Sequence, residues 1–145
     1  ITLCGPGGEW TVPFDGAFQG RMRVSPGDLV ARVRIPCWAL TARHAHIKKI
    51  AQEKIDYPLV NVTALWKDGA LRVAFSGLAG RPFRSPEAEV ILNDRGASPE
   101  NRAAGAARIL AELAHGDAES SKEYRLFVAR NTLQTLLEDW EDGAL

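Results

Sequence analysis

The sequence predicts an α+β fold in which a three-stranded antiparallel sheet packs on three helices. Strand-like segments fill the first half of the chain, and helical periodicity dominates after Gly77. The order of strands first and helices after is typical of a layer of helices on one face of an antiparallel sheet.

Three segments supply the strands of the predicted sheet. Residues 42–50 can extend as a strand, and residues 59–66 and 70–76 are rich in apolar and β-branched residues. Asp68-Gly69 lies between the last two segments and is a strong signal for a hairpin turn. We therefore expect a meander of three strands.

Three helices are predicted to follow, each beginning at a serine. A Ser-Pro-Glu triplet opens the first two, at 85–87 and 98–100, and combines a capping serine with a first-turn proline and an early carboxylate. These two helices are expected to end at about Leu92 and at about His115. The third runs from Ser120 or Ser121 to about Trp140 with one apolar stripe.

The first 40 residues carry strand signals of their own. Residues 1–4 and 10–12 flank a Gly-Pro-Gly-Gly turn, which predicts a hairpin, and residues 13–28 read as loop or a short turn. Residues 29–35 alternate apolar residues with arginines, which predicts a half-buried strand ended by Pro36. The chain opens directly in a strand at Ile1 without an initiator Met, so we expect a fragment whose upstream partner is missing.

Composition excludes several function classes. The 145 residues suit one domain, or one domain and part of another. Equal totals of 18 basic and 18 acidic residues leave no electrostatic footprint for nucleic acid, and no apolar run is long enough to cross a membrane. Cys4 and Cys37 form neither a metal-ligand spacing nor a disulfide framework, so we expect buried free thiols. With no signal peptide visible, the default location is cytoplasmic.

Lys48 and Asp56 can each be interpreted either as structural residues or as residues that contact a ligand. Lys48-Lys49 reads either as a solvated basic pair or as an amine that projects from a strand toward a ligand. Reduced flavin gains negative charge on its pyrimidine edge, and a nearby ammonium would stabilise that charge. Asp56-Tyr57-Pro58 reads either as a turn or as an aspartate that orients a basic group or a cofactor loop. Residue types alone leave both alternatives open.

Histidines offer a weaker candidate. His44 and His46 would share one face of an extended strand with Lys48. No cysteine or carboxylate accompanies them at a useful spacing, so we predict no metal site. No Ser/His/Asp or Cys/His set can be assembled, and we therefore assign no catalytic residue.

Several segments in one order carry a family resemblance. The segments are Gly27–Pro36, Lys48 with Asp56-Tyr57-Pro58, Asp68-Gly69, Arg81-Pro82-Phe83-Arg84 followed by Glu89 and Leu92, and Ser121-Lys122-Glu123-Tyr124-Arg125. Their order and spacing resemble the C-terminal portion of the FAD-binding flavoprotein subunit of molybdenum hydroxylases, the family of xanthine dehydrogenase and carbon monoxide dehydrogenase flavoproteins. The likeness covers essentially the whole chain.

The resemblance implies an oxidoreductase role. Such a subunit carries electrons through FAD between iron–sulfur clusters and an acceptor such as NAD or a quinone, while substrate is hydroxylated at a molybdopterin site elsewhere. The implied partners are the iron–sulfur and molybdopterin subunits of the same complex, and a homodimer is left open. The implied domains are residues 1–40, the tail of the FAD-binding domain, and residues 41–145, an α+β domain.

The resemblance also implies cofactor contacts. The family's contacts to the FAD edge fall on Val30 or its neighbour Leu29, and on Lys48, while Asp56 occupies a recurring acidic position. Gln52 and Glu53 stand where members often carry an arginine, which departs from the pattern. The glycine-rich loops that grip the FAD pyrophosphate belong upstream of Ile1, so we expect this fragment alone to bind FAD weakly or not at all and to be inactive.

The rival hypothesis is a non-catalytic α+β module for protein interaction or ligand binding. An upstream reading frame with two glycine-rich loops would favour the flavoprotein, and a native start near Ile1 would favour the module. Stoichiometric bound zinc or iron would instead indicate a small metal enzyme using His44 and His46.

Overall fold

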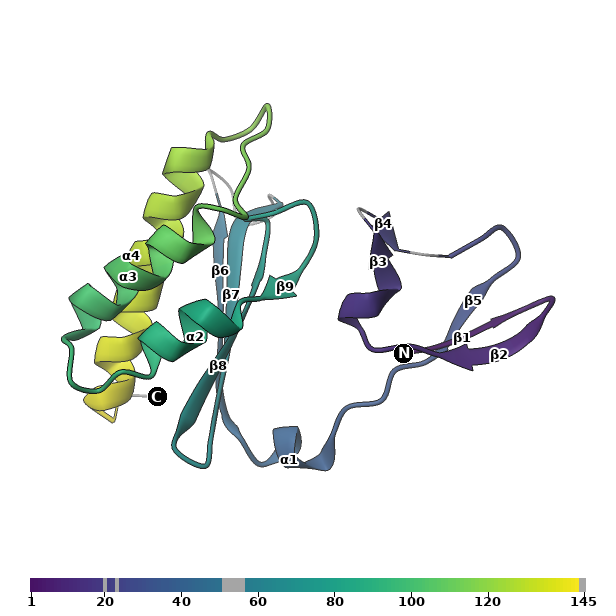
Figure 1. Cartoon of the computed structure of the whole chain (residues 1–145), viewed down its shortest axis with the longest axis horizontal. Helices are drawn as coiled ribbons and strands as arrows, with labels where there is room; N and C mark the ends of the chain where they lie inside the picture. The colour runs from purple at the N-terminus through teal and green to yellow at the C-terminus, as the bar shows by residue number, and fades with distance from the viewer. Residues whose placement is uncertain (20, 23, 51–56, 144–145) are drawn as a thin grey trace. The chain divides into compact units, whose positions relative to one another are not determined.

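The chain divides into two compact units, Ile1–Thr41 and Ala42–Leu145. The computed structural model describes residues 1–19, 21–22, 24–50 and 57–143 (Figure 1). None of the helices in these ranges is long and apolar enough to cross a membrane.

The second unit contains a four-stranded antiparallel sheet whose strands differ in length. Its strands are β6 (Arg43–Ile50), β7 (Pro58–Lys67), β8 (Ala70–Ser76) and β9 (Phe83–Arg84), hydrogen-bonded in the order β6-β7-β8-β9. Asp68 and Gly69 both adopt positive φ angles, of 54° and 77°, at the turn between β7 and β8. The predicted meander is confirmed, and the two-residue β9 extends it by a short fourth strand.

Three helices follow the sheet and begin where the serines predict. The helices are α2 (Pro86–Leu92), α3 (Pro99–Leu110) and α4 (Lys122–Glu141), capped by the side chains of Ser85, Ser98 and Ser121. Helix α3 ends before the predicted His115 because the chain tightens: Glu112 and Leu113 donate to carbonyls three residues back. The backbone N–H of His115 then donates to Leu78, which draws the chain out of the helical path.

All three helices cover the same face of the sheet (Figure 1). Alternate residues of the two central strands point into this layer, so that Val60, Val62 and Ala64 of β7 are fully buried. Helix α4 contributes Leu133 and Leu136 to the same core. The predicted fold class is therefore confirmed.

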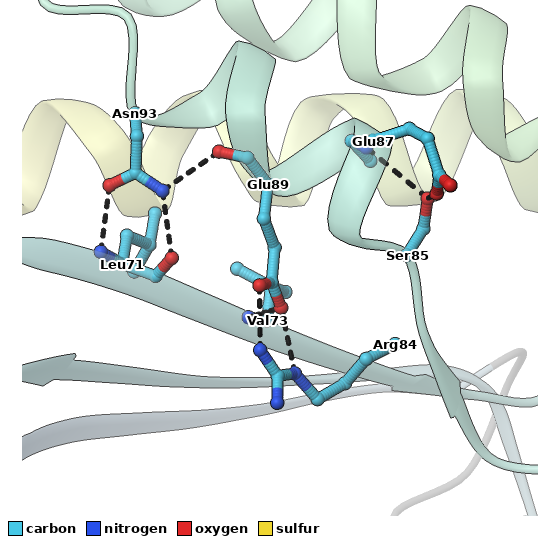
Figure 2. Close-up of polar contacts among 8 residues, drawn as sticks. Leu71, Val73, Arg84, Ser85, Glu87, Glu89 and Asn93 are labelled. Atoms are coloured by element: carbon cyan, nitrogen blue, oxygen red, sulfur yellow. Dashed lines mark hydrogen bonds and ion pairs between the residues drawn. The ribbon is translucent and has the colours of Figure 1, made fainter.

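Helix α2 also protects the edge of strand β8 (Figure 2). The Asn93 side chain pairs with both backbone groups of Leu71, at 2.8 and 2.9 Å. The Glu89 carboxylate accepts from the N–H of Val73 at 2.9 Å and from the Arg84 guanidinium. Side chains thus satisfy edge groups that would otherwise be free to pair with another strand.

We expect Asn93→Ala to destabilise the chain by about 1–3 kcal/mol, because both backbone groups of Leu71 lose their partner. Urea unfolding followed by circular dichroism measures the change. Asn131→Ala removes an exposed asparagine from α4 and is the matched control. Equal losses in the two variants would contradict the edge-capping role.

The first unit consists of a small sheet and several short helical and strand segments. Strands β1 (Thr2–Gly5), β2 (Gly8–Thr11) and β5 (Leu29–Arg32) form a three-stranded sheet in the order β2-β1-β5, which confirms the predicted hairpin. The segment predicted as loop contains a short 3-10 helix, η1 (Asp15–Ala17), and a two-stranded ribbon of β3 (Phe18–Gln19) and β4 (Arg21–Met22). A single helical turn, α1 (Cys37–Leu40), follows.

Three predictions for this unit were wrong. The strand predicted to reach residue 35 ends at Arg32, because the register pairs Arg32 with Thr2 at the beginning of β1 and leaves no strand beyond it. All four residues of β5 are exposed rather than half-buried. The Cys37 thiol, expected to be buried, is exposed at the start of α1.

Candidate functional site

The sheet of the second unit has a face that no helix covers, which we call the open face. Ala45 is buried and Ile47 packs against the core, so the alternating residues of β6, His44, His46 and Lys48, lie on the opposite face. These three side chains are exposed, which confirms the prediction that they share one face.

Lys48 begins a row of polar side chains across three strands of the open face. The register places Lys48 opposite Asn61 and Asn61 opposite Ser76. The Asn61 amide nitrogen donates to the Ser76 hydroxyl at 3.0 Å. The Asn61 Oδ1 is shielded from solvent and has no hydrogen-bond partner within the described part of the chain. The row therefore offers an ammonium beside an amide and a hydroxyl, a set that suits the polar edge of a ligand.

The next row on the open face contains His46. Its Nδ1 lies 2.7 Å from the Thr63 hydroxyl on the neighbouring strand. Among the described residues, no group of three histidine, cysteine or acidic side chains is placed to hold a metal ion.

A buried arginine fixes the end of the sheet on which Lys48 lies. Arg125, in the first turn of α4, is only 4% exposed and donates to the carbonyls of Leu59 at 2.6 Å and Gly77 at 2.5 Å. Its other terminal nitrogen donates to both oxygens of Asp117, at 2.7 Å each. Arg125 thereby locks the helix onto the sheet. The neighbouring Tyr124 is half exposed and stacks on Phe127.

The pairing with Arg125 also lowers the pKa of the Asp117 carboxyl. The hydrogen bond from Arg125, with further bonds from the N–H groups of Glu119 and Ser120, holds the pKa of the Asp117 carboxyl below its ordinary value of 3.8. A carboxyl whose pKa is lower in the folded state stabilises the fold above its unfolded pKa. That contribution is lost as the pH falls through the folded pKa.

We expect Asp117→Asn to lower stability at pH 7, and we expect its difference from the unmodified chain to shrink as the pH falls below about 4. The asparagine oxygen still accepts from Glu119 and Ser120, so the variant removes mainly the charge facing Arg125. Thermal unfolding between pH 7 and pH 2.5 measures this. Glu119→Gln removes an equal charge from the same loop, and a loss at pH 7 as large as that of Asp117→Asn would contradict the pairing.

Two of the remaining predicted site residues, Leu29 and Val30, belong to the first unit, whereas Lys48 belongs to the second. Leu29 and Val30 are neighbours on β5 of the first unit, 70% and 45% exposed, and pair with Cys4 and Leu3 of β1. Asp56 lies outside the described residues. Leu29 and Val30 are consecutive on β5, so their side chains point to opposite faces of its sheet, and Lys48 belongs to the other unit.

Arg84 and His115 have structural partners. Arg84 binds Glu89 through both its Nε and a terminal nitrogen. His115 accepts from the N–H of Gly80 at 3.1 Å and so holds the crossing from sheet to helices. Asn61 and Ser76, which sequence analysis missed, become visible only through the strand register.

The family follows from a comparison with family models. The model for the CO dehydrogenase flavoprotein C-terminal domain matches residues 45–140, and the chain belongs to this family. This confirms the resemblance to the C-terminal portion of molybdenum hydroxylase flavoprotein subunits. No curated protein sequence that was compared matches the chain.

Solved structures share the fold. Carbon monoxide dehydrogenase from Hydrogenophaga pseudoflava, in a form that lacks the Mo-pyranopterin moiety of the molybdenum cofactor, aligns with a TM-score of 0.75 at 22% identity over 92% of this chain and 49% of that chain. Quinoline 2-oxidoreductase from Pseudomonas putida 86 gives a TM-score of 0.74 at 23% identity over 99% and 52%. Reconstituted CO dehydrogenase from Oligotropha carboxidovorans gives 0.67 at 22% identity over 92% and 49%. The chain spans about half the length of these relatives.

Proposed function

We propose that the chain is part of the FAD-containing electron-transfer subunit of a molybdopterin-dependent dehydrogenase or hydroxylase. Membership of the CO dehydrogenase flavoprotein C-terminal domain family carries this proposal. The similar structures of carbon monoxide dehydrogenase and quinoline 2-oxidoreductase support the oxidoreductase setting. Bound FAD would supply the redox chemistry, accepting electrons from iron–sulfur clusters of one partner subunit and passing them to an acceptor. The molybdopterin subunit would be the other partner.

Lys48 is the residue of this chain that we assign to the flavin edge. Its side chain is exposed on the open face, next to an amide and a hydroxyl group, so an ammonium is available there to a ligand. A cation at the pyrimidine edge favours the reduced, more negative flavin over the oxidised form. Lys48 would therefore raise the reduction potential of the flavin.

The first unit would supply the apolar part of the cofactor contact. Leu29 and Val30 expose large apolar side chains on opposite faces of β5, and Val30 or its neighbour Leu29 would contact the flat ring of the flavin. We propose that residues 1–40 are the tail of the FAD-binding domain and that residues 41–145 are the C-terminal domain, with Asp56 in an orienting role. In this proposal the 145 residues alone bind FAD weakly or not at all.

The test is the natural gene product that contains these residues. We expect the purified protein to carry bound flavin, visible in its absorption spectrum. We expect Lys48→Ala to lower the reduction potential of that flavin, because the variant removes the charge that stabilises the reduced form. Spectroelectrochemical titration measures the potential.

Lys49→Ala is the matched control, since it removes the same charge from the adjacent residue of β6, which alternation places on the other face. A flavoprotein whose potential responds equally to both variants would contradict the role of Lys48. A gene product that purifies without flavin and does not take up FAD would contradict the function itself and favour the non-catalytic module.

A further inference from the structure

A cavity of about 460 Å³ lies at one end of the second unit, within the size range of small-molecule pockets. Seven residues from every layer of the unit line it: Arg43, Trp66, Arg95, Arg102, Leu137, Trp140 and Glu141. The buried Arg102, Leu137 and Trp140 form its floor, and the exposed Arg43 and Arg95 stand at its rim. The cavity therefore has a fixed floor and accessible cationic walls.

Two arginines and two tryptophans stack along this cavity, and we call Arg43, Trp66, Arg95 and Trp140 the arginine–tryptophan cluster. The indoles of Trp66 and Trp140 have ring centroids 5.2 Å apart. The Arg95 guanidinium lies over Trp66 at 5.0 Å, and the Arg43 guanidinium lies over Trp140 at 5.2 Å. Stacking on an indole orients a guanidinium while leaving its N–H groups, which lie in the plane of the group, available to a ligand.

The charges around the cavity are unbalanced. Three arginines face one glutamate, which leaves two formal positive charges in excess in a chain whose total charge is zero. Glu141 is engaged by Arg102, whose other terminal nitrogen donates to the carbonyl of Leu92 at 3.2 Å. Within the described ranges, neither Arg43 nor Arg95 pairs with a carboxylate, so their attraction for an anion is not used internally.

The floor has unused donors as well. Arg102 is 2% exposed and Trp140 is 7% exposed. The Nε of Arg102 and the indole nitrogen of Trp140 have no hydrogen-bond partner among the residues that the structure describes. A buried guanidinium compensated by a single, half-exposed carboxylate is further stabilised when an anion binds beside it.

From these observations we infer that the cavity binds a small oxyanion with two or more negative charges, carried by phosphate or carboxylate groups. Arginine forks match the paired oxygens of either group. Each indole already contacts a guanidinium and the other indole, so recognition rests on the arginine edges rather than on stacking of a base.

The site is separate from the proposed flavin contact. Arg43 and Lys48 lie near opposite ends of β6, five residues apart, or about 16 Å along an extended strand. They also lie on opposite faces of the sheet, since Arg43 alternates with Lys48 and reaches Trp140 on the helical side. The inference therefore does not rest on FAD binding.

Isothermal titration calorimetry of the 145-residue chain with inorganic pyrophosphate and, separately, with citrate tests the inference. We expect saturable binding of at least one of the two, weakened by added sodium chloride. Stronger binding of pyrophosphate would indicate a phosphate-bearing ligand, and stronger binding of citrate a polycarboxylate. Absence of binding by both anions would overturn the inference.

Arg43→Gln and Arg95→Gln should each weaken binding by about tenfold or more, because each removes a charge-assisted bidentate contact. Arg108→Gln removes an exposed arginine from α3 outside the cavity and should leave affinity unchanged. Equal losses in all three variants would overturn the inference. If Arg95→Gln fails to fold, Arg95→Lys keeps the cation near Trp66 without the planar fork and should still bind more weakly; undiminished binding would overturn the site.

Discussion

The guanidinium of Arg125 joins the start of α4 to strand β7, to Gly77 just after β8 and to the loop of Asp117 through four hydrogen bonds. Two carbonyls can converge on it because Gly77 has a φ of 79° and no side chain; a Cβ there would stand 2.4 Å from the Leu59 oxygen. Leu59 lies two residues before Asn61, which pairs with Lys48. The arrangement of the polar row on the open face therefore depends on a contact made from the opposite, helical side.

A sheet covered on one face only must still satisfy its edges and its second face. Helix α2 covers the edge of β8 beyond the short β9. There Glu89 and Asn93 form hydrogen bonds with the β8 backbone. The open face carries polar and charged side chains such as His46, Thr63 and Lys48. This division suits a domain that presents a hydrophilic surface for recognition while its core is complete on the other side.

The elements that could be predicted from the sequence are those encoded by neighbouring residues. Asp68-Gly69 defines a hairpin, and the serines at 85, 98 and 121 define helix starts, because each acts within three or four residues. The extent of β5 could not be predicted, since it depends on how much of β1 is available for pairing. Arg125 contacts Leu59 from 66 positions away, and Arg102 contacts Glu141 from 39 positions away. No local sequence pattern predicts contacts between residues so far apart.

The partners of the arginines distinguish structural positions from ligand-binding ones in this chain. Arg125 is buried, and both of its terminal nitrogens donate hydrogen bonds within the fold. Arg84 is paired with Glu89, whose hydrogen bond raises the pKa of the guanidinium. Both arginines therefore have structural roles. Arg43 and Arg95 contact aromatic rings, which orient a cation without neutralising it. Arg102 stands between these cases, with one carboxylate and one carbonyl at its terminal nitrogens. Arg43 and Arg95 lie together at one end of the unit, at the cavity, and an anion bound there would supply the carboxylate or phosphate partner that neither has among the described residues.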